Sequence, residues 1–121
     1  MKRRNLMSLL VALWVPASLA GTVVCSGTVD KVAFHASDKL MLRLSSMDAG
    51  VFICSFSSVW SVSGTSYTTA PETCKAFHSM LLSAQALGTH INSMYFDGDQ
   101  VPAACNQWGA WKSANIRYFS R

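Results

Sequence analysis

The sequence lacks the short motifs by which many enzymes and metal-binding proteins are recognised. It contains no Gly-x-Ser-x-Gly elbow, no His-Glu-x-x-His pair and no two carboxylates in an apolar setting suited to acid–base catalysis. None of the three histidines, His35, His78 and His90, has an evident orienting partner. The four cysteines include no Cys-x-x-Cys pair, which disfavours a zinc site. We therefore expect no enzyme, no metal and no cofactor.

Charge is also scarce, and it is unevenly placed. Asp, Glu, Lys and Arg together make up 13% of the chain, with a formal net charge of +4. Three of the ten basic residues are Lys2, Arg3 and Arg4, and beyond them seven basic residues are set against six acidic ones. A net charge of +1 over the rest of the chain leaves no basic stripe, so we expect no nucleic-acid partner.

The first twenty residues have the layout of a secretory signal peptide. A basic start at 2–4 is followed by an apolar run at 6–15 and then by small residues that end at Ala20. A retained membrane anchor is the alternative, but the apolar run is shorter than the ~20 residues that a membrane-spanning helix needs. We therefore predict cleavage after Ala20, a single domain at 21–121 with no membrane span, and a secreted or periplasmic location.

Four cysteines in an exported domain predict two disulfides. We pair Cys54 with Cys74, because that bridge would tie a Ser- and Thr-rich loop at 57–69 to the start of a helix. The second pair is then Cys25 with Cys105. The sequence alone is also compatible with the two other connectivities.

One stretch, residues 69–96, predicts a helix that leads directly into a strand. Pro71 suits the first helical turn, and Gly88 suits the left-handed residue after the last turn. Apolar residues between them recur every three or four positions, which is the period of a helix with one buried face. These residues are Cys74, Phe77, Leu81 and Ala84. Beyond the helix the period falls to two, which indicates the strand.

Five strands are predicted in all, and they are residues 21–34, 39–45, 51–56, 91–96 and 113–119. The first needs a bulge near Ser26 and Gly27, since neither of its alternating sets is apolar throughout. The second is the most regular, with its three leucines, Leu40, Leu42 and Leu44, facing inward. Residues 97–107 are predicted to be a polar turn, where Asp97 makes local hydrogen bonds.

These elements predict a mainly β domain with one helix, of the α+β or all-β class. Three strands, a helix and two strands is the order of an OB-fold, a small and partly open barrel. We therefore expect a five-stranded OB-fold-like barrel with the helix between strands 3 and 4 and with two disulfides. Other small barrels and α+β sandwiches share parts of this order.

Several segments resemble a known family. They are CSGTVDKVAFHASDKL from Cys25, FIC ending at Cys54, AFHSMLLSAQALGT from Ala76 and INSMYFDGD from Ile91. In this order they resemble the binding (B) subunits of subtilase cytotoxin and typhoid toxin, secreted OB-fold proteins that form five-membered rings and bind sialylated glycans. The resemblance covers most of residues 25–99. It implies a cell-surface glycan as ligand, a homopentamer, and a catalytic toxin subunit as partner.

The resemblance also implies site residues. In the family a serine in the first strand helps to hold the sugar carboxylate, and Ser26 occupies the matching place. A tyrosine late in the strand after the helix contributes too. Its nearest matches are Tyr95 and Phe96, of which Phe96 is the closer and lacks the hydroxyl. The acidic residue that the family has ahead of the serine is absent from 21–24, and its C-terminal cysteine pair is not matched.

Tryptophans supply further candidates for sugar binding. Sugars pack their C–H faces on exposed aromatic rings, and Trp60, Trp108 and Trp111 lie in polar segments. The alternative for each is burial in the core, since Trp is highly buried on average. We therefore predict a disulfide-stabilised glycan-binding module that resembles a toxin B subunit. The alternative is a structural or protein-interaction domain of the same fold without sugar binding.

Overall fold

The chain folds into seven strands and one helix over residues 21–121, which are the residues described by the computed structural model. In chain order they are β1 (Gly21–Gly27), β2 (Val29–His35), β3 (Lys39–Leu44), β4 (Val51–Ser55), α1 (Pro71–Leu87), β5 (Ile91–Gly98), β6 (Lys112–Ser113) and β7 (Asn115–Ser120). The predicted signal peptide, residues 1–20, lies outside the described residues. The prediction of a mainly β domain with one helix is confirmed.

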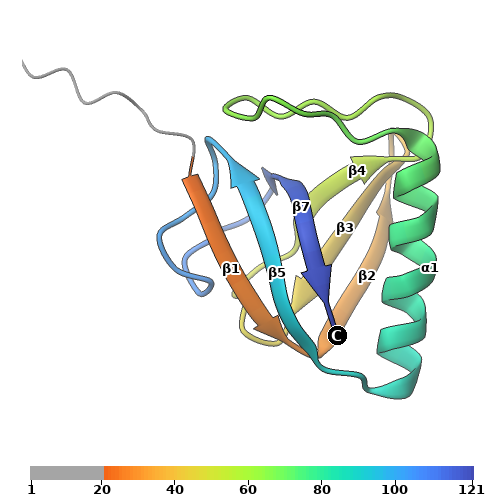
Figure 1. Ribbon diagram of the computed structural model, residues 1–121, viewed down its shortest axis with the longest axis vertical. Helices are drawn as coiled ribbons and strands as arrows, with labels where there is room; N and C mark the ends of the chain where they lie inside the picture. Colours follow the sequence, from red (N-terminus) through yellow and green to blue (C-terminus); the bar gives the residue numbers. More distant parts are fainter. Residues whose placement is uncertain (1–20) are drawn as a thin grey trace, which may run out of the picture.

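The strands form two sheets rather than one closed barrel. The first sheet has the antiparallel order β1-β5-β7 (Figure 1). The second has the order β2-β3-β4-β6, with β6 parallel to β4. The structure therefore differs from the predicted five-stranded barrel, because it has seven strands in two open sheets. The physical reason is that the chain changes sheet at Thr28, between β1 and β2, and again at Ala114, between β6 and β7. The predicted strands 21–34 and 113–119 are therefore each divided between the two sheets.

The bend after β1 is built from Gly27 and Ser45. The register of β1 on β5 shifts between Cys25 and Gly27, the place where a bulge was predicted, but the extra residue lies in β5, because Cys25 pairs with Met94 and Gly27 with Ile91. Gly27 has a φ of 133°, a conformation that residues with a side chain rarely adopt, and a Cβ there would collide with the Ser45 side chain. The Ser45 Oγ accepts from the Thr28 N–H at 3.0 Å, and the Ser45 N–H donates to the Thr28 carbonyl at 2.9 Å. Ser26 is exposed, as the alternation along β1 requires.

The core lies between the two sheets and beneath the helix. Strand alternation decides what is buried, and the three leucines of β3 that were predicted to face inward, Leu40, Leu42 and Leu44, are fully buried. Other fully buried side chains are Ile53, Leu81, Ile91, Met94 and Phe96. Burying each such side chain contributes roughly 1.5–3 kcal/mol, so this shared core is the main force that holds the two sheets together.

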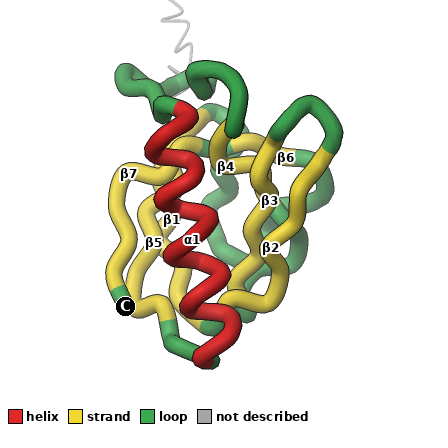
Figure 2. Tube along the Cα trace, turned by 90° about the vertical axis from the view of Figure 1, so that its right-hand side faces the viewer, coloured by secondary structure: helices red, strands yellow, loops and turns green. Residues whose placement is uncertain are grey.

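α1 covers the opening between the sheets, with β7 on one side of it and β2 on the other (Figure 2). It begins at Pro71 and ends at Leu87, and the φ of 63° at the next residue, Gly88, is the predicted left-handed conformation. The Gly88 N–H donates to carbonyls of the last turn, those of Ala84 and Gln85, which would otherwise lack a hydrogen-bond partner within the helix. Within residues 21–121 no helix is long and apolar enough to cross a membrane.

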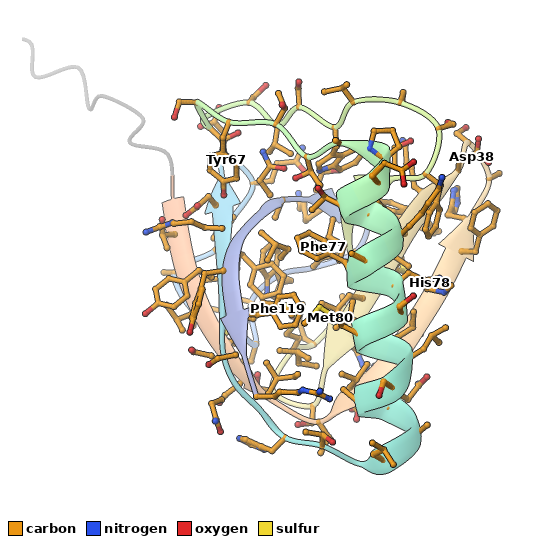
Figure 3. All side chains as sticks on the ribbon, turned by 45° about the vertical axis from the view of Figure 1, so that its right-hand side comes forward. Asp38, Tyr67, Phe77, His78, Met80 and Phe119 are labelled. Atoms are coloured by element: carbon orange, nitrogen blue, oxygen red, sulfur yellow. A yellow bond between two sulfur atoms is a disulfide. The ribbon has the colours of Figure 1, made fainter. Side chains whose placement is uncertain are left out.

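The apolar face of α1 packs inward as its periodicity predicts. Three members of that face, Cys74, Leu81 and Ala84, are buried. The fourth, Phe77, points toward Phe119 of β7, and their ring centroids lie 5.7 Å apart (Figure 3). The helix is therefore held against the three-stranded sheet as well as the four-stranded one.

Both predicted disulfides are present. Cys54–Cys74 joins β4 to the first turn of α1, and Cys25–Cys105 joins β1 to the segment between β5 and β6. The paired cysteines are 20 and 80 residues apart in the sequence. In the chain-entropy description, closing loops of these lengths contributes about 3 and about 4–5 kcal/mol to the free energy of unfolding.

Candidate functional site

Three of the predicted site residues, Trp60, Phe96 and Trp108, are buried in the core. Trp60 donates its indole N–H to the Ala114 carbonyl at 3.1 Å. Trp108 packs edge-to-face on Phe96, with the ring centroids 5.1 Å apart. A small core needs large rings to fill it at native density, and these three serve that purpose. They are not exposed to pack on a sugar, so we do not carry them into the proposed site.

Ser26 and Tyr95 lie on the outer face of the three-stranded sheet. Val24 of β1 pairs with Tyr95 of β5, and residues two apart on a strand share a face, so the exposed Val24 and Ser26 lie on the same side as Tyr95. Tyr118 of β7 pairs with Tyr95 from the opposite direction, with ring centroids 6.0 Å apart. Tyr118 is 57% exposed. This face therefore presents two adjacent phenol rings.

A bulge at Arg117 turns Tyr118 outward. The register of β5 on β7 shifts between the pairs Tyr95–Tyr118 and Phe96–Ile116, which leaves Arg117 as the extra residue. Strict alternation would place Ile116 and Tyr118 on one side of the strand. With the bulge, Ile116 stays in the core while Arg117 and Tyr118 are both exposed.

A pocket of about 340 Å³ opens next to this face, lined by ends of β1, β5 and β7 and by the loop that precedes α1. Its acidic group is the buried Asp97, whose carboxylate accepts from Arg117 Nε at 2.9 Å and from Nη2 at 2.7 Å. Tyr67, which lies near the end of β5 (Figure 3), donates its hydroxyl to the same carboxylate at 2.6 Å. The Thr22 hydroxyl donates to it at 2.6 Å and accepts from Arg117 Nη2 at 3.1 Å.

These contacts keep the carboxylate and the guanidinium ionised. Hydrogen bonds from Arg117 lower the pKa of Asp97 from 3.8 to about 2, although burial acts in the opposite direction. The hydrogen bonds to Asp97 raise the pKa of Arg117 further above its usual value. Burial, and then the hydrogen bond to Asp97, raise the pKa of the Tyr67 phenol. At neutral pH the pocket therefore contains a fixed ion pair and a neutral phenol.

One edge of the Arg117 guanidinium is committed to Asp97, and the other edge is open. Within residues 21–121, Nη1 makes no hydrogen bond. The guanidinium carbon lies 5.4 Å from the centre of the Tyr95 ring, so the same cation borders both the pocket and the phenol rings. The combination of one exposed and one half-buried phenol ring, a cation with free N–H donors and nearby hydroxyls suits a ligand that has both apolar faces and oxygen acceptors. We call Ser26, Tyr95, Arg117 and Tyr118 the tyrosine site.

Trp111 is the one exposed tryptophan within residues 21–121, and it lies on the other sheet. It precedes β6, is 65% exposed, and contacts Phe52 of β4 and His35 of β2. The structure thus separates the predicted residues into three groups. Trp60, Phe96 and Trp108 are in the core, Ser26 and Tyr95 are on the outer face of the three-stranded sheet, and Trp111 is on the four-stranded sheet.

The sequence analysis missed the ion pair. Asp97 was expected in a turn, but β5 runs on to Gly98, so Asp97 is a strand residue that pairs with Thr22. The available signal was an acidic residue at the end of one predicted strand and a basic residue, Arg117, inside another. Opposite charges on neighbouring strands stabilise each other, but only the strand order reveals that these two strands are neighbours.

No protein-family model, curated protein or solved structure matches this chain. Within residues 21–121 no group of three or more His, Cys, Asp or Glu side chains is placed to hold a metal ion.

Proposed function

We propose that the protein is an exported glycan-binding module whose ligand occupies the tyrosine site. The observation that carries the proposal is the pair of the half-buried Tyr95 and the exposed Tyr118 beside Arg117, a cation with one edge fixed by Asp97 and the other open. The phenol rings accept the C–H face of a sugar. The free Nη1 group of Arg117 donates to a ring oxygen, a hydroxyl or a carboxylate. Ser26 supplies a hydroxyl on the same face.

An acidic sugar suits this site better than a neutral one. The Asp97 carboxylate is buried and already accepts hydrogen bonds from Arg117, Thr22 and Tyr67, so it is shielded from a bound anion. A carboxylate on the ligand would meet the open edge of Arg117 in a charge-assisted hydrogen bond. The resemblance to sialic-acid-binding toxin subunits supports the same ligand class.

We also propose that the domain has an OB-like fold. An OB-like arrangement is supported by the two places where the chain passes from one sheet to the other, at Thr28 and Ala114, and by a helix that follows β4 and precedes β5. The resemblance to toxin B subunits supports export, a homopentamer and a catalytic toxin subunit as partner. In a ring of five, weak single-site binding gains strength through avidity.

A protein-interaction domain without sugar binding is the second candidate. Large apolar side chains on α1, Met80, Leu82 and Leu87, are exposed. Apolar residues at the surface of a helix suit contact with another protein chain.

A broad glycan array probed with the oxidised, exported protein tests the proposal, with its mass in solution determined on the same sample. Selective binding of acidic glycans that falls when Ser26→Ala is introduced, but not when the exposed helical Ser79→Ala is, is the expected result. A folded protein with no glycan signal overturns the proposal in favour of the protein-interaction domain.

A further inference from the structure

The outer face of the four-stranded sheet has a second pocket, beside Trp111. Its volume is about 270 Å³, and its lining includes Lys31, Arg43 and Trp111. The indole ring packs on Phe52 in a stacked arrangement at 5.9 Å and meets the edge of His35 at 5.4 Å. With two rings behind it and 65% of its surface exposed, Trp111 is a supported aromatic platform.

The segment that precedes Trp111 is fixed to the sheet by Asp48. Its carboxylate accepts from the Trp108 N–H at 2.8 Å and from the Gly109 N–H at 3.0 Å. These backbone hydrogen bonds, led by that of Gly109, lower the pKa of Asp48. Trp111 itself has a φ of 64°, so its ring is placed by a specific backbone conformation rather than by a free chain.

Two cations border the same pocket. Lys31 of β2 pairs directly with Arg43 of β3, which puts both side chains on one face of the sheet. The Arg43 guanidinium makes no hydrogen bond within residues 21–121, and its nearest carboxylate, Asp30, lies 3.6 Å from Nη2. Its Nε is buried, so the terminal Nη groups, one of which forms an ion pair with Asp30, are the donors that a ligand can reach.

We propose that the Trp111 pocket binds an acidic saccharide, with the sugar ring on Trp111 and its carboxylate or sulfate at Lys31 and Arg43. The site is separate from the tyrosine site, which lies on the other sheet, so it does not depend on the proposed function. Guanidinium and ammonium groups hold a single anion well, and an exposed indole packs on a sugar ring.

Local charge favours a saccharide over single-stranded nucleic acid. Asp30 and Asp48 lie near the two cations, where they accept hydrogen bonds from sugar hydroxyls but repel a succession of phosphates. The net charge of +1 over residues 21–121 also provides little attraction for a polyanion.

The test is a fluorescence titration of the oxidised, exported protein, in which the difference between the wild type and Trp111→Phe isolates the signal of Trp111. The probes are a galacturonate disaccharide with one carboxylate, a monosulfated disaccharide, neutral chitotetraose and a ten-residue oligothymidylate. We expect the Trp111 signal to respond to at least one of the acidic saccharides and not to chitotetraose. Comparison of the galacturonate with the sulfated disaccharide identifies which anion the site prefers.

Charge variants test the contacts. Lys31→Gln and Arg43→Gln are each expected to weaken binding about tenfold, while Lys75→Gln, which removes the same charge from exposed α1, leaves it unchanged. Arg43 has a buried Nε, so Arg43→Gln could lower the stability of the fold. Lys31 is exposed, and Lys31→Gln therefore tests the contact independently of stability.

Four results would overturn the proposal. They are an absent Trp111 response to both acidic saccharides, an equal response to chitotetraose, a response to oligothymidylate alone, and binding that Tyr118→Ala reduces as much as Lys31→Gln does. The last result would place the acidic saccharide at the tyrosine site. If tyrosine-site variants lose array binding but keep the Trp111 response, the result bears on the tyrosine site alone, and the inference about the Trp111 pocket stands.

Discussion

Asp97 and Arg117 form a two-point ion pair across neighbouring strands, with both carboxylate oxygens accepting from the guanidinium at 2.9 and 2.7 Å. The bulge in β7 makes this possible, because it turns Arg117, the extra residue, to the outer face, where its side chain reaches Asp97 of β5. A guanidinium held at two points cannot rotate freely, so its remaining N–H donors point in a defined direction. The ion pair therefore organises the tyrosine site before any ligand binds.

The first prediction concerns acid stability. The pKa of Asp97 is about 2 in the folded protein, below its value near 4 in an unfolded chain, so the stability it contributes is present above about pH 4 and is lost as the pH falls toward 2. Chemical denaturation across this range should show a loss of about 2 kcal/mol from this group. Asp97→Asn should make the slope shallower, and the exposed neighbour Asp99→Asn should not. An unchanged slope in Asp97→Asn would contradict the assignment.

The second prediction compares two glycines with positive φ. Gly88 has open space around its missing Cβ, so Gly88→Ala should lower the free energy of unfolding by about 1 kcal/mol through backbone strain alone. Gly27→Ala adds a collision with Ser45 and should cost about 2–3 kcal/mol. Urea denaturation of both variants measures the difference. Equal costs would show that the bend between β1 and β2 is not built as described.

The third prediction separates a structural tryptophan from a binding one. Trp60→Phe keeps a buried ring but removes the N–H that donates to the Ala114 carbonyl, so unfolding should become easier by about 1–3 kcal/mol. Glycan binding by the folded variant should stay within about twofold of the wild type, since Trp60 is buried. If the Trp60→Phe variant kept its stability but no longer bound glycan, Trp60 would have to be counted as a binding residue.

The fourth prediction ranks the disulfides. Cys25→Ser with Cys105→Ser opens the longer loop and should cost about 4–5 kcal/mol, against about 3 kcal/mol for Cys54→Ser with Cys74→Ser. Urea denaturation of the two double variants gives the order. The reverse order would show that the Cys54–Cys74 bridge, rather than loop length, dominates by holding α1 to β4.

Local patterns predicted the helix and most of the core. Pro71 and Gly88 delimit α1 because backbone chemistry at helix ends is local, and Leu40, Leu42 and Leu44 are buried because alternation is local too. The division into two sheets was not predictable in the same way. It depends on where the chain stops pairing with strands of one sheet and begins pairing with strands of the other. The residue types at these points, Thr28 and Ala114, do not indicate such a change.

The positions of the candidate binding residues depended still more on tertiary structure. Trp108 and Trp111 stand three residues apart in one polar segment, yet the first is in the core and the second is exposed. Hydrogen bonds from the Trp108 and Gly109 N–H groups to Asp48, about sixty residues earlier in the chain, help to set that difference. Tyr118 was missed because the bulge at Arg117 breaks the alternation on which strand predictions rest.

The most direct test of glycan binding at the tyrosine site is a comparison of Tyr118→Ala and Tyr118→Phe by calorimetric titration with the strongest array ligand. Tyr118→Phe keeps the ring and should bind within about threefold of the wild type, whereas Tyr118→Ala should weaken binding about tenfold or more. Phe34→Ala, which truncates an exposed aromatic side chain of β2, is the matched control and should bind normally. A folded Tyr118→Ala protein that binds as well as the wild type would contradict the account.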